Sequence, residues 1–423
     1  MITYLDFVVQ SHQFNRPLGI TSICSAHPYV IEAALRNGKA KQIPVLIEAT
    51  CNQVNQYGGY TGMTPADFVR FVEGIALRVG FPRERILLGG DHLGPLVWAN
   101  EPAASAMAKA GALVRAYVEA GFRKIHLDCS MPCADDHNFS PAVVAERAAE
   151  LAAEAEAASQ GASLPLPRYV IGTEVPPAGG AKAEENRLLI TRPEDAAETL
   201  ELTRQAFLKR GLDGAWERVV AMVVQPGVEF GDAQVHEYHR EEAQTLSRFI
   251  EAQPGLVYEA HSTDYQSREA LRALVEDHFA ILKVGPALTF AFREAVFALA
   301  AIEEVLCDEP SRIVKVLEDA MLSNPKYWVK YYRGDERALA LARRYSFSDR
   351  IRYYWATPAV EQAFQHLRSN LTRVAIPLTL LSQYLPQQYR KVREGWLANA
   401  FDALVLDKIQ TVLEDYNLAC GLG

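Results

Sequence analysis

Residues 124–131 read Lys-Ile-His-Leu-Asp-Cys-Ser-Met, a short apolar run that holds His126 and Asp128 two positions apart. Side chains alternate between the two faces of a β-strand, so this spacing puts the imidazole and the carboxylate on the same side. Burying a polar group without a partner costs roughly 2–7 kcal/mol, and burying a charge costs more. The run therefore predicts a strand in which the two groups satisfy each other or bind a metal ion or ligand.

The same unit recurs along the chain: a short apolar strand, a polar or Gly/Pro-rich loop, and a segment of helical period. The predicted strands span residues 20–26, 45–49, 86–89, 124–131, 169–175, 219–225, 256–260 and 280–284. Eight such units within residues 1–290 are what an α/β fold of the (β/α)8 type, the TIM barrel, requires. A doubly wound open sheet is the alternative.

Polar residues gather at the C-terminal ends of these strands, which favours the barrel, because there the strand ends meet at one mouth. His92 and His261, with Glu174, make a nitrogen and oxygen set suited to Zn²⁺ or a similar divalent metal. Asp91 and Asp128 are then candidates for general acid and base beside the ion. The candidate substrate-binding residues are His27, Glu48, His126, Ser262, Asp264 and Lys283.

Composition and charge exclude several classes of protein. Hydrophobic residues make up 49% and charged residues 22% of the 423 residues, as in ordinary globular enzymes. The net charge of −9 without a basic cluster argues against a nucleic-acid partner or an anionic membrane surface. No apolar run is long enough to span a membrane, and we see no signal peptide. The six cysteines lack C-x-x-C pairs and disulfide-like spacing, so we expect reduced thiols in the cytoplasm.

Nucleotide-binding motifs are missing. The chain has neither G-x-x-x-x-G-K-[ST] nor G-x-G-x-x-G, so we expect neither a P-loop kinase nor a dinucleotide enzyme. A sugar phosphate can still bind at the backbone amides that follow strands seven and eight, around Ser262, Thr263 and Gly285. Those small residues serve equally well as turn formers.

The alternation of strand and helix stops beyond Pro286, and residues 291–423 are predicted to form a helical extension packed on the barrel. Helical periods cover residues 291–306, 313–322, 357–371 and 400–416. Residues 348–355 put Arg350 and Arg352 beside aromatic side chains. These arginines either reach an anionic ligand or partner chain, or pack an amphipathic surface against the core.

Long unbroken motifs carry a resemblance to a known family. Cys24-Ser25-Ala26-His27-Pro28 and residues 46–68, 89–95, 124–131, 169–176, 223–230, 258–266 and 281–290 closely resemble the GatZ/KbaZ family. Residues 348–355 and 382–386 match the tail of that family, so the resemblance covers nearly the whole chain.

The resemblance implies a class II aldolase-like barrel that is the non-catalytic subunit of class II D-tagatose-1,6-bisphosphate aldolase. Such a subunit supports the activity and stability of a separate catalytic chain. The resemblance places Asp91 at the catalytic acid position beside a metal-ligating His92, with Glu174 and His261 as further ligands. Class II aldolases supply another histidine at the end of strand six, where this chain has Gln225 as the candidate ligand.

Some relatives are described as metal-dependent 4-epimerases of tagatose, fructose or their phosphates, and this is the alternative function. A metal ion would hold neighbouring substrate oxygens while two carboxylates, Asp91 with Asp128 or Glu174, move protons on opposite faces of the sugar. For either function we expect a small sugar or sugar phosphate as ligand and an oligomeric protein. The subunit function adds a catalytic aldolase chain as partner.

Overall fold

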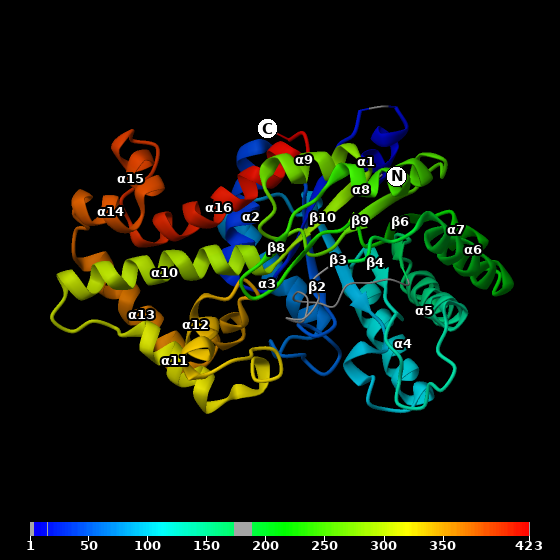
Figure 1. Ribbon diagram of the computed structural model, residues 1–423, viewed down its shortest axis with the longest axis horizontal. Coiled ribbons are helices and arrows are strands. Elements are labelled where there is room, and N and C mark those ends of the chain that lie inside the picture. Colours follow the sequence, from blue (N-terminus) through cyan, green and yellow to red (C-terminus); the bar gives the residue numbers. More distant parts are fainter. Residues whose placement is uncertain (1–3, 15, 173–187, 423) are drawn as a thin grey trace.

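A closed barrel of eight parallel strands forms the centre of the computed structural model, which describes residues 4–14, 16–172 and 188–422 (Figure 1). The strands are β1 (Ile20–Cys24), β2 (Val45–Thr50), β3 (Ile86–Leu93), β4 (Lys124–Leu127), β5 (Arg168–Ile171), β6 (Val219–Val223), β9 (Val257–Ala260) and β10 (Phe279–Val284). Each pairs with its neighbour in this order, and β10 pairs with β1. The (β/α)8 prediction is confirmed, and the open sheet is excluded.

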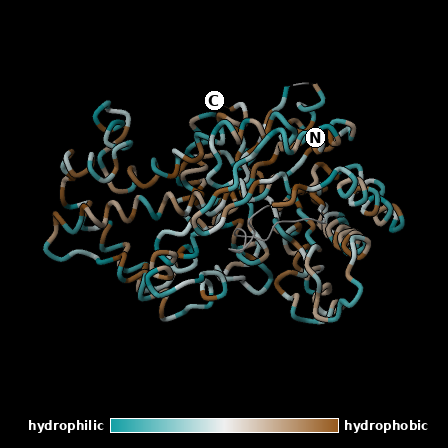
Figure 2. Tube along the Cα trace, in the orientation of Figure 1, coloured by the Kyte–Doolittle hydropathy of each residue, from teal (hydrophilic) through white to brown (hydrophobic). Residues whose placement is uncertain are grey.

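One long helix follows each strand and covers the outside of the barrel. These helices are α2 (Pro28–Lys41), α3 (Pro65–Val79), α4 (Ala103–Ala120), α5 (Pro141–Gly161), α6 (Pro193–Lys209), α8 (Arg240–Glu251), α9 (Arg268–Glu276) and α10 (Pro286–Leu306). In Figure 2 many helices alternate between hydrophobic and hydrophilic residues along their length, as helices with one buried face do. The sequence also fixes where a helix begins: at the start of α3, the side chains of Thr64 and Asp67 each accept a hydrogen bond from the other's backbone amide.

Short elements fill the connections of the barrel. They are η1 (Arg83–Arg85), η2 (Pro95–Trp98), α7 (Asp213–Trp216) and an antiparallel pair formed by β7 (Glu229–Phe230) and β8 (Val235–His236). No helix in the described ranges combines the length and the apolar composition that crossing a membrane requires.

Helix α1 (Tyr4–Gln13), which the sequence patterns did not predict, packs against residues of the barrel strands. Leu5, Val8 and Val9 are buried in one cluster with strand residues such as Leu46 and Val257. Asp6 accepts two hydrogen bonds from Arg168 on β5, at 2.6 and 2.9 Å. Helix α1 therefore buries apolar side chains of the strands that the eight outer helices do not reach.

An ionic layer occupies the barrel interior above this apolar cluster. Lys124 Nζ lies 2.6 Å from Glu48 Oε1 and 2.5 Å from Glu259 Oε2. Lys283 Nζ contacts Asp91 and lies 3.6 Å from Glu48 and 3.5 Å from Glu259. All five residues are at most 5% exposed. We call Glu48, Asp91, Lys124, Glu259 and Lys283 the ionic layer.

The C-terminal helices form the predicted extension on one side of the barrel, away from α4 to α6 (Figure 1). They are α11 (Ile313–Ser323), η3 (Pro325–Tyr327), α12 (Glu336–Tyr345), η4 (Arg350–Tyr354), α13 (Pro358–Arg373), α14 (Leu378–Tyr384), α15 (Pro386–Arg393) and α16 (Phe401–Ala419). The helices α12, α14 and α15 lie in stretches where no helix was predicted. Helix α16 returns to the barrel and packs against α2, α9 and α10. The predicted boundary at residue 290 falls inside α10, so a separate domain over residues 291–423 stays a prediction.

The substitution Lys124→Met tests the ionic layer. It leaves Glu48 and Glu259 without their closest cation, and an unpaired buried charge costs roughly 3–5 kcal/mol. We expect a loss of about that size in the free energy of unfolding, measured by urea denaturation. The matched control is Lys315→Met, which removes an exposed pair with Asp319 and should change stability far less. Equal effects of the two substitutions would contradict this account of the barrel interior.

Candidate functional site at the barrel mouth

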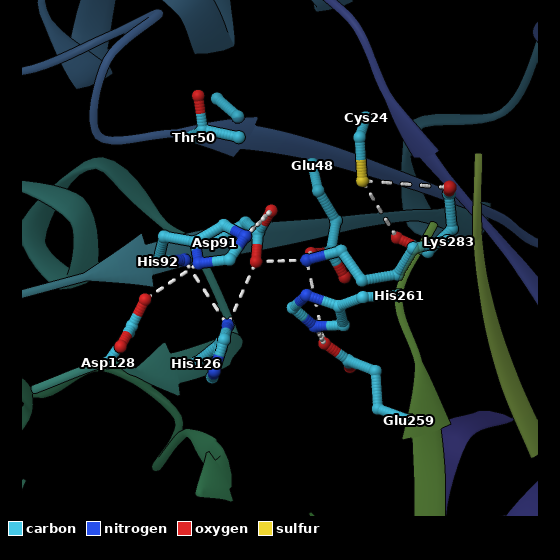
Figure 3. Close-up of polar contacts among 12 residues, drawn as sticks. Cys24, Glu48, Thr50, Asp91, His92, His126, Asp128, Glu259, His261 and Lys283 are labelled. Carbon is cyan, nitrogen blue, oxygen red and sulfur yellow. Dashed lines mark hydrogen bonds and ion pairs between the residues drawn. The ribbon is translucent and has the colours of Figure 1, made fainter. Parts of the chain in front are cut away.

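Three histidine rings meet at the C-terminal ends of the barrel strands (Figure 3). His92 is the residue before the last of β3, His126 lies in β4, and His261 directly follows β9. Their ring centroids are 4.9 to 5.1 Å apart, and each side chain is at most 4% exposed. With Asp91 they form a group in which one ligand atom of each residue lies within 4.8 Å of the others. We call Asp91, His92, His126 and His261 the histidine cluster.

A carboxylate fixes the orientation of each ring. His92 Nδ1 donates to Asp128 Oδ2 at 2.7 Å, and His126 Nδ1 donates to Asp91 Oδ1 at 2.9 Å. His261 Nε2 donates to Glu259 Oε1 at 3.0 Å. Each ring keeps a second nitrogen, which is the usual arrangement of a metal-binding histidine. The second nitrogen of His126, Nε2, is buried without a hydrogen-bond partner in the described part of the chain.

A lowered pKa keeps two of these rings, His126 and His261, in the neutral form. Burial lowers the pKa of His126, and burial together with the charge of Lys283 lowers the pKa of His261 well below the usual value. Burial also opposes the charged form of His92, but the carboxylates of Asp91 and Asp128 outweigh it and raise the pKa of His92. Neutral imidazole is the form that binds a metal ion, so His126 and His261 need not lose a proton first.

The carboxylates at the mouth are held in the ionised form. Burial opposes ionisation of Asp91, but His92 and Lys283 outweigh it and hold the pKa of Asp91 well below its usual value. For Asp128 the hydrogen bond from His92 outweighs burial and lowers the pKa. Each carboxylate therefore carries a negative charge at neutral pH that stabilises a neighbouring cation or N–H group.

The backbone around His92 brings the end of β3 close to the loop after β4. His92 has a φ of 49°, in the left-handed region that non-glycine residues rarely adopt. Two residues on, a Cβ atom on Gly94 would lie only 1.7 Å from the carbonyl oxygen of Asp128, so only glycine fits there. Asp128 N donates to Leu93 O at 3.0 Å and begins the loop after β4, which ends at Leu127 rather than at the predicted Met131. The two loops are thus joined, and Asp128 reaches His92.

A cavity of about 320 Å³ opens above the histidine cluster. The barrel contributes Asp91, His92, His261, Ser262, Asp264 and Lys283 to its lining. The extension contributes Lys326, Tyr327, Tyr331, Arg350, Arg352 and Tyr353. The cavity is therefore built by both parts of the chain.

A known protein family matches the chain over nearly its full length. A model of the family described as D-tagatose-1,6-bisphosphate aldolase subunit GatZ/KbaZ-like matches residues 5–421. The chain belongs to the GatZ/KbaZ-like family. The resemblance inferred from the sequence motifs is confirmed.

Individual members of the GatZ/KbaZ-like family match over the full length. The D-tagatose-1,6-bisphosphate aldolase subunit GatZ of Klebsiella pneumoniae is 54% identical over 416 residues, which cover 98% of either chain. The subunit of that name from Salmonella newport is 53% identical with the same coverage. A crystal structure described as a probable tagatose 6 phosphate kinase from Sinorhizobium meliloti 1021 shares 51% identity and a TM-score of 0.88, covering 95% of this chain and 100% of that one.

The structure of this GatZ/KbaZ-like chain separates the predicted site residues into groups. Glu48 lies below the cluster in the ionic layer. His27 lines a neighbouring cavity of about 330 Å³ and packs on Phe292, with ring centroids 4.1 Å apart. Gln225 Oε1 accepts hydrogen bonds from the amides of Gly227 and Val228, so the structure does not bring this oxygen to the cluster. Glu174 lies outside the described residues.

Residues that the sequence analysis gave no role complete the site. Lys124 and Glu259 hold the ionic layer, and Glu259 also orients His261. Side chains alternate along β4, so Lys124 lies on the same side as His126, and the sequence could have predicted that Lys124 points into the barrel. The basic residue Lys326 carries no comparable signal, because its place beside the barrel depends on how the extension folds back.

Asp264 holds the loop at the end of β10. Its Oδ1 accepts hydrogen bonds from Gly285 N at 2.9 Å and Ala287 N at 2.8 Å. Burial raises the pKa of Asp264 to about 6 in spite of these two bonds. The folded chain therefore binds a proton at Asp264 more tightly than the unfolded chain, where the pKa is near 3.8.

The substitution Asp264→Asn tests this burial. Ionising the buried carboxyl group costs stability as the pH rises from 3.8 to about 6, and the two pKa values correspond to about 3 kcal/mol. Asparagine keeps an oxygen for both amides and cannot ionise. In urea denaturation we expect the variant to gain up to about 3 kcal/mol over wild type above pH 6, and little near pH 4. A difference that does not change with pH would contradict the raised pKa.

Proposed function

We propose that this chain is the non-catalytic subunit of a class II D-tagatose-1,6-bisphosphate aldolase and that it binds and stabilises a separate catalytic chain. The observation that carries the proposal is the full-length match to relatives named as subunits of that aldolase. The 4-epimerase alternative has less support, because these relatives are named as aldolase subunits and not as epimerases.

Two features of the mouth support a chain that does not itself perform aldol cleavage. A general acid works best with a pKa near the operating pH, whereas the contact with Lys283 helps to keep Asp91 ionised. Gln225 stands where the aldolase resemblance implies a histidine ligand, and its side-chain oxygen is engaged by its own loop. The expected catalytic acid, Asp91, is thus held ionised, and an expected histidine ligand is replaced by Gln225.

The histidine cluster fits a divalent metal ion such as Zn²⁺. Three imidazoles and a carboxylate match the ligands that this ion prefers, and one possible ligand atom of each lies within 4.8 Å of the others. When bound, such an ion would polarise an oxygen of a ligand in the cavity. We therefore place His126 among the metal ligands rather than among the substrate-binding residues. Glu174 stays a prediction from the sequence, and Gln225 is not among the ligands that we propose, because its side-chain oxygen is engaged by its own loop.

We propose a sugar or sugar phosphate in the cavity and an oligomeric assembly with the catalytic chain. We place the protein in the cytoplasm, where its six cysteines, all free in the structure, would stay reduced.

A co-expression experiment tests the subunit function. The catalytic aldolase chain is expressed with and without this chain, and D-tagatose 1,6-bisphosphate cleavage and thermal inactivation are measured. We expect the two chains to co-purify and the catalytic chain to be stabilised by about 2.7 kcal/mol when this chain is present at about 100 times its Kd. This chain alone should show no cleavage. Cleavage by the isolated chain, or a catalytic chain unaffected by its presence, would contradict the proposal.

Zinc titration of the chelator-treated chain tests the ligand set. We expect His126→Gln to weaken Zn²⁺ binding more than tenfold, and Asp128→Asn to weaken it about 10–100-fold through the loss of its support for His92. Gln225→Ala should leave the affinity unchanged. The matched control is His278→Gln, because His278 contacts His12 outside the cluster. Wild-type affinity in His126→Gln would return His126 to a substrate-binding role.

A further inference from the structure

The wall that the extension adds to the cavity carries three basic side chains. Lys326 comes from the segment after α11, and Arg350 and Arg352 come from η4. We call Lys326, Arg350 and Arg352 the extension cations. Apart from the residues at the end of β10, every barrel residue that lines the cavity lies more than 60 positions away from them in the sequence. Only the folding of the chain therefore brings these cations to the mouth.

The extension cations form no ion pair in the described part of the chain. Within the described part of the chain, no carboxylate oxygen lies within the ion-pair distance of 4.0 Å from any of them. Arg350 Nη1 donates to Tyr327 O at 3.1 Å, and its Nε is buried without a partner in the described residues. Arg352 Nη1 donates to the backbone oxygens of Ser348 and Asp349, and its Nη2 donates to the Tyr353 hydroxyl. The hydrogen bonds fix these groups but do not neutralise their charge.

Nearby carboxylates are already engaged elsewhere. Asp349 accepts a hydrogen bond from Thr289 at 2.6 Å and lies 3.4 Å from Arg293, and it attracts Arg352 without forming an ion pair with it. The chain as a whole carries a net charge of −9, so an unpaired group of three cations is not a consequence of overall composition. Arg350 is only 4% exposed, and a buried guanidinium without a counter-charge is costly.

Aromatic rings hold the extension cations in position. The Arg350 guanidinium lies over the ring of Tyr331, and that of Arg352 lies 4.5 Å from the ring centre of Tyr353. Lys326 Nζ lies 4.5 Å from the ring centre of Tyr327. Cation–π contacts of this kind reduce the conformational freedom that an anion would otherwise have to remove on binding.

We propose that the cavity binds a phosphorylated ketohexose, with its phosphate on the extension cations and its sugar oxygens toward the histidine cluster. Arginine forms paired hydrogen bonds with phosphate oxygens, and lysine adds a point charge. A volume of about 320 Å³ is at the lower end of small-molecule sites, which suits a sugar phosphate. The sugar class rests on the proposed function, whereas the anionic end rests on the extension cations alone.

Calorimetric titration of the full chain with D-tagatose 6-phosphate and with D-tagatose tests this assignment. The two probes differ only in the phosphate, so their affinity ratio reports the anionic end of the cavity. We expect the phosphorylated sugar to bind at least about tenfold more tightly, the effect of one charge-assisted hydrogen bond. Inorganic phosphate should compete with the phosphorylated sugar and not with the free one.

Substitutions at the cavity wall locate the effect. Lys326→Gln and Arg352→Gln should each weaken D-tagatose 6-phosphate binding several-fold and leave D-tagatose binding unchanged. The matched control is Lys330→Gln, because Lys330 is exposed on the same segment and does not line the cavity. Lys326 is exposed as well, so Lys326→Gln decides the question if the Arg352 variant does not fold.

The outcomes are distinct. Equal affinities for the two sugars, no detectable binding of the phosphorylated sugar, or wild-type affinity in Lys326→Gln and Arg352→Gln would overturn the inference. Phosphate-dependent binding in a chain that does not stabilise the aldolase would remove the proposed function and leave the anion site. Stabilisation of the aldolase without phosphate-dependent binding would remove the anion site and leave the proposed function.

Discussion

The ionic layer is the constraint on which the rest of the molecule depends. Two ammonium groups and three carboxylates are enclosed in the barrel, where each charge is tolerable only beside its opposite. Such pairing requires the strands to keep their register, because a slip of one residue would turn Lys124 or Glu259 out of the interior. Apolar residues around α1 seal one side of the layer, and the histidine cluster lies on the other. The barrel is therefore organised around charge as much as around apolar packing.

The ionic layer also continues into the mouth. Glu259 pairs with Lys124 on one side and receives the N–H of His261 on the other, so one carboxylate belongs to both parts. Asp91 does the same between Lys283 and His126. This sharing keeps the carboxylates ionised and the rings oriented, which favours binding of a cation or ligand over proton transfer. The extension adds three basic residues to the wall of the cavity, so the lining combines a histidine cluster with a group of cations.

The sequence predicted the barrel because parallel strands buried on both faces appear as short apolar runs, each followed by a helical period. It also brought Asp91, His92, His126 and His261 to one place, because strand ends in a barrel meet. It did not separate His27 and Gln225 from that group, because packing on Phe292 orients His27 and hydrogen bonds within its own loop orient Gln225, and neither follows from strand polarity. Helix α1 and Lys326 were missed as contributors for a related reason: their contacts join distant parts of the chain and leave no local period. For Arg350 and Arg352 the sequence left an anionic ligand, a partner chain and surface packing open.

The last helix of the chain reaches the mouth through one tyrosine. Tyr416 on α16 donates its hydroxyl to Thr263 O at 2.7 Å, in the loop that carries Ser262 and Asp264. A few residues later, Cys420 O accepts a hydrogen bond from Gly19 N, just before β1. The loop of the cavity and the entry to the first strand are thus both fastened by residues of α16 and the turn after it. Both points are synthesised long before α16, so during synthesis the nascent chain must wait for α16 before either is fastened, and a product truncated before α16 would lack both bonds.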